Sequence, residues 1–398
     1  MHCANLLVPT ICFQESKKMH KKWLNGLALV SVASGALTSS AAVNVSAQTA
    51  AGSKATQADM QNLPPLTPGA SDGDYAIGPD YTNAPELTAR DNVPKGMIYR
   101  FTMDSADSKI YPGISKNAPG TVVSYHRNVT VYVPSQYVPG MPTPFLVSQD
   151  SMGRGELPVI LDNMIADHRL PAMAAVMIDS GGGDAQGSER GLEYDTVSGK
   201  YAEFIETEVL PKITQDYHVA FSKDPNARMT MGGSSGGAAA FSMAWYHPEW
   251  YHRVLTYSGT YVNQQSPLNP ETPHGAWEYH AHLIPRSRVK PLRIWMQVGE
   301  NDIRSKDEES TYHNWPMANQ RMAEALKAKK YHYQFVFCRQ AGHVDGRAVR
   351  QTLPAALEYV WKGYYTGIFA PTGRCTSKIS LPIASADQSK KLIAGFFD

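Results

Sequence analysis

The chain is organised around the stretch Arg228-Met-Thr-Met-Gly-Gly-Ser-Ser-Gly-Gly-Ala-Ala-Ala-Phe241. Its apolar start indicates a strand and its alanine-rich end indicates a helix, so the glycines between them form a strand-to-helix turn. Within this turn, Gly232-Gly-Ser-Ser-Gly236 fits the pattern GxSxG, in which a serine stands at a strained position between residues without side chains. The pattern predicts a nucleophile at Ser234, and the first N–H groups of the helix favour developing negative charge there.

A second register of the same motif makes Ser235 the nucleophile, because Gly233-Ser-Ser-Gly-Gly237 also fits GxSxG. We favour Ser234, since that register puts Met231 directly before the first glycine and leaves Gly237 as a further small residue where the helix packs closely. A phosphate-binding loop is the other interpretation of such glycines. It would carry a lysine after its last glycine, where this chain has Ala238.

Composition favours a loop-rich globular enzyme. The formal net charge of +1 provides no overall field that would attract nucleic acid or an anionic membrane. A hydrophobic fraction of 42% is typical of a protein with a substantial core, and 398 residues allow one large domain or two medium ones. Neither partner class is therefore expected.

The N-terminus has the organisation of an export signal. A basic cluster, Lys17 to Lys22, precedes the mostly apolar run from Trp23 to Leu37, and Val45-Ser-Ala47 is a small-x-small ending. We expect residues 1–47 to be a signal peptide cleaved after Ala47, with Met19 as the candidate true start, and the mature protein to be periplasmic or secreted. The alternative is a retained membrane anchor, for which the run is short.

Cleavage would leave Cys338 and Cys375 as the cysteines of the mature chain. In an oxidising compartment they can form a disulfide, but spacing alone does not settle whether they do. The sequence has no CxxC pair or histidine-rich cluster that would indicate a metal, and we expect no cofactor.

Three parts of the chain follow the expected signal peptide. Residues 48–95 are polar and rich in small residues, which predicts a flexible lead-in with a short ordered piece at Asp74-Tyr-Ala-Ile-Gly78. Residues 96–365 alternate apolar strands with amphipathic helices and form the expected catalytic domain, and 366–398 form a C-terminal tail. The alternation predicts an α/β fold with a mostly parallel sheet covered by helices on both faces.

The expected strands and helices of this domain were placed by apolar periodicity. Strands are expected at 97–102, 127–133, 143–148, 172–178, 228–233, 253–258, 292–298 and 331–337. Helices are expected at 158–168, 201–217, after the serine turn, at 314–329 and at 353–364.

Two later strand ends carry the partners that a serine nucleophile needs. A serine hydroxyl is activated by an imidazole, which in turn needs a carboxylate to hold its tautomer and stabilise its charged form. Asp302 follows the strand that ends at Val298, and His343 follows the strand that ends at Phe337, in the chain order serine, acid, histidine. We therefore predict a triad of Ser234, Asp302 and His343. Glu300 is the alternative acid.

An oxyanion hole should complete such a site. One donor is expected to be the backbone N–H of Ser235, and the other the N–H of Met152 or Ser151 in the loop after the 143–148 strand.

These motifs together resemble the esterase-D-like esterase family of the α/β-hydrolase superfamily, in particular its bacterial enterochelin-esterase-like branch. The resemblance spans roughly Gly96 to Tyr365. It rests on Val131-Tyr-Val-Pro134, Ser148-Gln-Asp150, Glu193-Tyr-Asp195, Gly232-Gly-Ser-Ser-Gly-Gly237, Gly299-Glu-Asn-Asp302, Asn314-Trp-Pro-Met-Ala-Asn319 and Ala341-Gly-His343.

The resemblance implies an α/β-hydrolase fold, ester chemistry, and a triad at Ser234, Asp302 and His343. Relatives include siderophore trilactone esterases, feruloyl and acetylxylan esterases, S-formylglutathione hydrolases and mycolyl transferases, so the substrate stays open. The chain departs from the family's glycine-rich pattern after the histidine, where it has Val344-Asp-Gly-Arg347. That difference leaves open the shape of the site's edge formed by the loop after His343.

Three residues are candidates for contact with the substrate: Arg190, Glu193 and Trp277. Arg190 and Glu193 would either meet a polar or acidic substrate, as the resemblance implies, or pair with each other to brace a loop. Trp277, with Tyr279, His280 and His282, would form either an aromatic cleft for aryl or sugar esters or a packed cap.

The sequence thus predicts an exported serine esterase that acts on a small-molecule or polysaccharide-linked ester. An acyltransferase of the same fold, and a non-catalytic homologue that binds polysaccharide or siderophore, are the alternatives.

Overall fold

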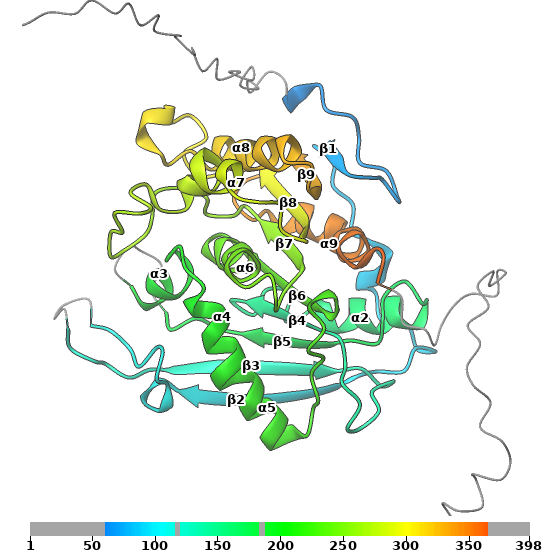
Figure 1. Cartoon of the computed structure of the whole chain (residues 1–398). Coiled ribbons are helices and arrows are strands. Elements are labelled where there is room, and N and C mark those ends of the chain that lie inside the picture. Colours follow the sequence, from blue (N-terminus) through cyan, green and yellow to red (C-terminus); the bar gives the residue numbers. More distant parts are fainter. Residues whose placement is uncertain (1–59, 116–119, 183–187, 365–398) are drawn as a thin grey trace, which may run out of the picture. The chain divides into compact units, whose positions relative to one another are not determined.

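The protein is described by a computed structural model that covers residues 60–115, 120–182 and 188–364 (Figure 1). The export signal expected at 1–47, Cys375 and the tail at 366–398 lie outside the described residues. Among the residues covered, no helix is both long and apolar enough to cross a membrane.

A single nine-stranded sheet forms the centre of the described part, in the order β1-β9-β8-β7-β6-β4-β5-β3-β2. All neighbouring strands run parallel except at one side, where β3 pairs antiparallel with β5 and β2 pairs antiparallel with β3. The strands are β1 Gly73–Ile77, β2 Met97–Asp104, β3 His126–Val133, β4 Phe145–Gln149, β5 Ala174–Ile178, β6 Arg228–Gly233, β7 Arg253–Tyr257, β8 Arg293–Gly299 and β9 His332–Cys338.

Helices cover both faces of this sheet, which confirms the predicted α/β fold with a mostly parallel central sheet. One face carries α4, α5, α6 and α8, and the other carries α2 and α9 (Figure 1). The helices are α2 Leu157–Ala166, α3 Glu189–Tyr194, α4 Lys200–Phe204, α5 Leu210–Tyr217, α6 Ser235–Tyr246, α7 Ile284–Arg286, α8 Trp315–Ala328 and α9 Gly346–Trp361. A π-helical turn, η3 Ile205–Val209, joins α4 to α5, so the single helix predicted for 201–217 is nearly continuous.

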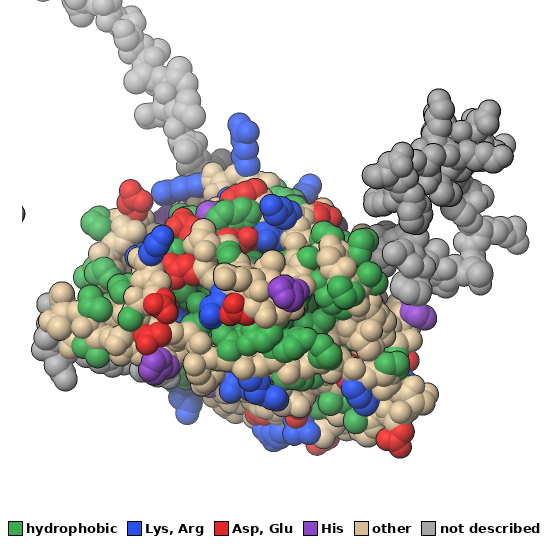
Figure 2. Space-filling view, turned by 90° about the horizontal axis from the view of Figure 1, so that it is seen from below, with side chains coloured by type: hydrophobic (Ala, Val, Ile, Leu, Met, Phe, Trp, Pro, Cys, Tyr) green, Lys and Arg blue, Asp and Glu red, His purple; other side chains and the backbone are tan. Residues whose placement is uncertain are grey.

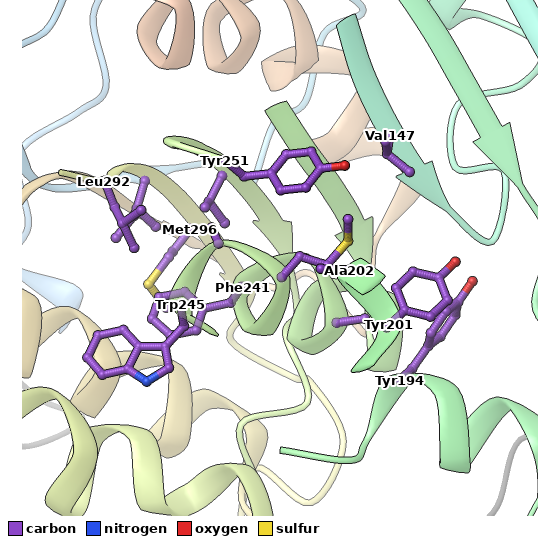
Figure 3. Packing of buried hydrophobic residues seen from close by; sticks show 14 of the residues in the cluster. Val147, Tyr194, Tyr201, Ala202, Phe241, Trp245, Tyr251, Leu292 and Met296 are labelled. Atoms are coloured by element: carbon purple, nitrogen blue, oxygen red, sulfur yellow. The ribbon is translucent and has the colours of Figure 1, made fainter. Parts of the chain in front are cut away.

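Large aromatic side chains fill the layer between the sheet and α6. Figure 3 shows Phe241 and Trp245 of α6 beside Met296 of β8, and it also labels Tyr194 and Tyr201, whose rings pack edge to face. The ring of Phe241 lies 4.9 Å from the ring of Tyr279, edge to face. Because the central strands are buried on both faces, their near-continuous apolar runs were readable in the sequence.

Within the described part of the lead-in, residues 60–95, strand β1 lies at the short ordered piece expected at Asp74 to Gly78. Strand β1 pairs in parallel with β9, with Gly73 opposite Gln334 and Ile77 opposite Cys338. The preceding segment folds back on β1 through hydrogen bonds from Ala76 N to Pro64 O and from Leu66 N to Ala76 O. Pairing satisfies the backbone groups of a segment whose side chains are too polar to signal a strand.

Helix α9 begins earlier than predicted. Its sequence pattern suggested a start at Leu353, but the helix starts at Gly346, where the side chain of Asp345 accepts the N–H of Arg347. Pro354 lies inside the helix and cannot donate to the carbonyl of Arg350. That carbonyl instead accepts the N–H of Ala84 at 3.1 Å, so the lead-in completes the hydrogen bonding of the last helix.

The side of the molecule below β2 and α5 in Figure 1 is the face shown in Figure 2. Hydrophobic side chains gather in the middle of this view among lysine, arginine and histidine side chains. β2 has half-buried Tyr99 and Phe101 on the inner side of this sheet edge, and both rings contact Tyr217 of α5, at 4.7 and 5.4 Å between centroids.

Candidate active site

Ser234 stands at the strained turn between β6 and α6. Its backbone has φ 57° and ψ −131°, a conformation that non-glycine residues rarely adopt. Its N–H donates to Tyr257 O at 2.9 Å and its carbonyl accepts the N–H of Thr260 at 3.0 Å, so the end of β7 holds the turn in place.

The flanking glycines are required by space. A Cβ on Gly232 would lie 2.3 Å from the carbonyl oxygen of Gly236, and a Cβ on Gly236 would lie 3.0 Å from Cβ of Gln149. These two positions are the glycines of GxSxG when Ser234 is its serine. Ser235, in contrast, is fully buried in the first turn of α6, where its Oγ lies 3.4 Å from Nε2 of Gln264. The geometry therefore favours the register in which Ser234 is presented.

Asp302 and His343 meet at the carboxyl ends of β8 and β9. Nδ1 of His343 lies 2.5 Å from Oδ1 of Asp302, which also accepts the N–H of Ile303 at 2.7 Å. The Asp302 side chain is fully buried, while the imidazole is about a quarter exposed. A buried carboxylate bound to Nδ1 leaves Nε2 of the ring available for a proton transfer.

The hydroxyl of Ser234 contacts Thr260 and not His343. Its Oγ lies 3.5 Å from Oγ1 of Thr260, and the described residues include no hydrogen bond between Ser234 and His343. The structure thus brings Asp302 and His343 together after β8 and β9 and puts Ser234 after β6, at the same edge of the sheet with β7 between them. Hydrogen bonds of this kind are often long in a protein without substrate.

Glu300, the alternative acid, faces away from this arrangement. Its Oε2 accepts the N–H of Gln340 at 2.8 Å, and its Oε1 accepts the Gln61 side chain at 2.5 Å. It therefore fastens the turn after β9 and the start of the described chain, and it does not contact His343.

In the loop expected to supply the second oxyanion donor, the candidate N–H groups already donate hydrogen bonds to backbone carbonyls. Asp150 and Ser151 both have positive φ, 54° and 49°, in a tight turn that Met152 N closes by donating to Gln149 O at 3.1 Å. The N–H of Ser151 donates to Ile178 O at 3.1 Å. Neither expected donor is thus available as the loop stands, whereas the N–H of Ser235 lies in the first turn of α6, where helical N–H groups lack intrahelical partners.

Arg190 and Glu193 do not pair with each other. Arg190 binds Asp150 through Nη2 to Oδ2 at 2.7 Å and through Nε at 3.1 Å. Glu193, which is 1% exposed, binds Arg127 at 2.5 and 3.0 Å and accepts the hydroxyl of Tyr125 at 2.7 Å. Glu193 is therefore buried and bound to Arg127 and Tyr125, and the substrate contact expected for it stays a prediction.

Asp150 lies beside the serine turn, since a Cβ placed on Gly236 would be 3.3 Å from its Oδ2. The ion pair with Asp150 therefore brings Arg190 close to this turn. The guanidinium side chain is only 12% exposed. Arg190 thus borders the site through Asp150.

Trp277 belongs to a packed cap. It is 3% exposed, and its ring packs edge to face against His280 at 4.5 Å and Tyr312 at 5.6 Å. The aromatic cluster around it therefore corresponds to the cap alternative, and the expected substrate contact of Trp277 has no exposed surface to support it.

Two residues near the triad positions were not identified from the sequence. Ser258, at the end of β7, donates to Oδ2 of Asp302 at 2.5 Å, and Thr260 contacts Ser234. The same strand-end rule that selected Asp302 also applies to Ser258, so the signal was present.

A cavity of about 590 Å³ lies away from this site, between the lead-in and α9. Its walls include Leu66, Trp295, Gln334, Tyr359 and Trp361, and they include none of Ser234, Asp302 and His343.

Comparison with family models identifies the family of the chain. A family model described as "Putative esterase" matches residues 121–359. A comparison with curated protein sequences gives no match.

Solved structures with similar folds include the enterobactin esterase of Shigella flexneri, with 19% identity, 69% of this chain covered and a TM-score of 0.47. This chain spans 60% of that protein's length. A ferulic acid esterase from Anaeromyces mucronatus is 12% identical over 70% of this chain and 96% of its own, with a TM-score of 0.47. The feruloyl esterase module from Clostridium thermocellum is 18% identical over 75% and 97%, with a TM-score of 0.47.

Proposed function

The chain belongs to the esterase family, and we propose that it is a serine carboxylic-ester hydrolase that works through an acyl-enzyme. The observation that carries the proposal is the pairing of His343 with buried Asp302 at the strand ends next to the strained turn of Ser234. A nucleophile, a base and an orienting acid are the groups that acyl transfer needs.

In the proposed reaction, Oγ of Ser234 attacks the ester carbonyl carbon while Nε2 of His343 takes the hydroxyl proton. Asp302 holds the Nδ1–H tautomer and stabilises the imidazolium. The carbonyl oxygen becomes an oxyanion, which the N–H of Ser235 and the positive end of α6 stabilise. His343 then gives the proton to the leaving alcohol, and an acyl-Ser234 ester remains.

Water completes the cycle by the same route. His343 takes a proton from a water molecule, the resulting hydroxide attacks the acyl carbon, and the carboxylic acid leaves as Ser234 recovers its proton. This sequence requires the Ser234 hydroxyl to turn from Thr260 toward His343, a rotation about one side-chain bond.

A second oxyanion donor would come from the loop at Met152. Its N–H is bound to Gln149 O in a turn whose two central residues have positive φ. Opening this turn when an ester binds would free the N–H, and relief of the strained backbone would offset part of the lost hydrogen bond. The side chain of Met152 borders the serine turn, since a Cβ on Gly233 would lie 3.6 Å from its sulfur.

The proposed substrate is a siderophore ester or an aryl or sugar ester, small or attached to a polysaccharide. This range follows the family resemblance and the named esterases of similar fold. We further propose that the protein acts in the periplasm or outside the cell, because of the signal-like segment at 17–47, and that it has no nucleic-acid or membrane partner once that segment is removed.

Turnover of a panel of esters by the wild type, Ser234→Ala and Ser235→Ala tests the proposal. The panel contains p-nitrophenyl acyl esters, feruloyl esters, acetylated xylan and a catecholate trilactone. We expect Ser234→Ala to lose at least about a thousandfold in kcat, because the covalent route is removed. Ser235→Ala should keep most activity, since its contribution is main chain.

Mass spectrometry after treatment with a fluorophosphonate should locate the adduct on Ser234. Full turnover by Ser234→Ala together with inactive Ser235→Ala would show that the other register is correct. Transfer of the acyl group to an added alcohol in preference to water would identify an acyltransferase instead.

A further inference from the structure

Ser258 joins the acid and the base of the proposed triad through one buried hydroxyl. Its Oγ lies 2.5 Å from Oδ2 of Asp302 and 3.0 Å from the backbone N of Val344, the residue directly after His343. We propose that Ser258 is a positioning residue that sets both the charge distribution of Asp302 and the placement of the His343 loop. This inference rests on the proposed function.

The two contacts of this hydroxyl assign its single hydrogen. The N–H of Val344 can only donate, so Oγ of Ser258 must accept there. The hydroxyl hydrogen is then directed to Asp302, whose ionised carboxylate can only accept. Ser258 is therefore a fixed donor to Asp302 and a fixed acceptor for the histidine loop.

The two carboxylate oxygens of Asp302 therefore have different hydrogen-bond partners. Oδ1 accepts hydrogen bonds from Nδ1 of His343 and the N–H of Ile303, whereas Oδ2 accepts the hydroxyl of Ser258. The side chain is fully buried, so water cannot replace a missing donor readily. Without the Ser258 hydroxyl, negative charge would stay on Oδ2 and the carboxylate would be free to rotate about its bond to Cβ.

The contact with Val344 concerns the shape of the rim. Val344 has φ +44°, a conformation that is unfavourable for a β-branched residue and that glycine adopts at little cost. The hydrogen bond to Ser258 helps to hold this conformation. Val344 also packs against the serine turn, because a Cβ on Gly233 would lie 3.1 Å from its Cγ1.

Ser258 itself is rigidly held. It is 3% exposed, its φ is +49°, and its N–H donates to Gln297 O at 2.6 Å. A strained backbone that is over-determined by its surroundings is typical of sites where position matters.

Loss of the Ser258 hydroxyl should change the basicity of His343 in a definite direction. A carboxylate without this donor carries more concentrated negative charge and stabilises the imidazolium more strongly. On the loop of His343, Asp345 is paired with Arg347, and from α8 the uncharged ring of Trp315 packs edge to face against the imidazole at 6.2 Å. The acid limb of kcat/KM against pH, which reports the free base, should therefore move to higher pH.

The test compares Ser258→Ala, Ser258→Thr and the matched control Ser105→Ala. Ser105 is also buried, and its Oγ likewise joins two groups, donating to Pro112 O at 3.0 Å and accepting the N–H of Tyr125 at 2.8 Å. We expect Ser258→Ala to lower kcat by roughly tenfold to a hundredfold with little change in KM, as for a lost hydrogen bond to a charged group. Its acid limb should shift upward, Ser258→Thr should restore the limb, and Ser105→Ala should leave it in place.

An acid limb in Ser258→Ala that stays in place or moves to lower pH would overturn the inference. The imidazole of His343 is also titrated by NMR in a Ser234→Ala background, where the result does not depend on turnover. An upward shift there with Ser258→Ala supports the inference even if Ser234→Ala retains activity and the proposed function fails. If Ser258→Ala does not fold, Ser258→Cys, whose thiol is a weak donor, should show a smaller shift in the same direction, and no shift would again overturn it.

Discussion

The carboxylate of Glu193 binds the guanidinium of Arg127, with both side chains at most 2% exposed. Removing one member of such a pair leaves a buried charge without its partner, which typically costs about 3 to 5 kcal/mol. We therefore expect Glu193→Gln to lower the free energy of unfolding by several kcal/mol, measured by urea denaturation. Asp216→Asn, which removes the exposed pair with Lys212, is the control and should cost less than about 1 kcal/mol. Equal effects of the two changes would contradict the assignment of Glu193 to a structural role.

A pH dependence of stability should arise one helical turn before Glu193. Burial, with added repulsion from Glu193, raises the pKa of the Glu189 carboxyl to about 7, from an ordinary value of 4.5. Because the folded pKa is the higher one, its stabilising contribution is complete below pH 4.5 and is lost as the pH rises through 7. In the wild type the free energy of unfolding should therefore fall by up to about 3 kcal/mol between pH 4.5 and pH 8, and this fall should be absent in Glu189→Gln. Unfolding curves for both proteins at several pH values measure this, and parallel pH profiles would show that Glu189 titrates normally.

Asp302→Asn should leave the fold intact and reduce kcat strongly. An amide can donate to His343 and favour the wrong tautomer, a change that in a serine protease triad lowers kcat by about 10⁴. Ester turnover at saturating substrate measures the loss. Glu300→Gln serves as the control, because Glu300 binds Gln61 and Gln340 and should be dispensable for catalysis. A larger loss in the control than in Asp302→Asn would assign the acid to Glu300.

Gly232→Ala should disrupt the serine turn directly. The added Cβ would approach the carbonyl oxygen of Gly236 to 2.3 Å, so backbone must move. We expect a loss of roughly 1 to 3 kcal/mol in the free energy of unfolding, as for overpacking elsewhere, together with loss of ester turnover. Gly155→Ala provides the comparison, since a Cβ at Gly155 meets nothing within 4 Å. Unchanged turnover in Gly232→Ala would argue against the strained turn as the source of the nucleophile.

The parallel strands and the strand-end residues could be predicted because each depends on local sequence. β5 is a fully buried apolar run, and the acid and the histidine lie in the loops that follow β8 and β9. For β1 the sequence indicated a short ordered piece but neither a strand nor its partner, because Gly73 and Asp74 give no apolar alternation. Its pairing is with a strand made much later in the chain.

The sequence also did not predict which charged side chains pair with one another. Arg190 and Glu193 are close enough along the chain to suggest a mutual pair, but they bind Asp150 and Arg127, which β4 and β3 bring to them. Such choices depend on which strands become neighbours, and the sequence does not give strand order. The same holds for Met152, whose N–H is bound within a turn that only the backbone angles reveal.

The pairing of β1 with β9 also affects the order in which the polypeptide can fold during synthesis. Gly73 leaves the ribosome early, yet its partner Gln334 is added near the end of the domain. Until then the first strand has no edge to join, and closing so long a loop carries an entropic cost that must be met before the contact stabilises anything. Completion of the sheet therefore waits for the final third of the chain, which keeps the nascent protein incompletely folded for most of its translation.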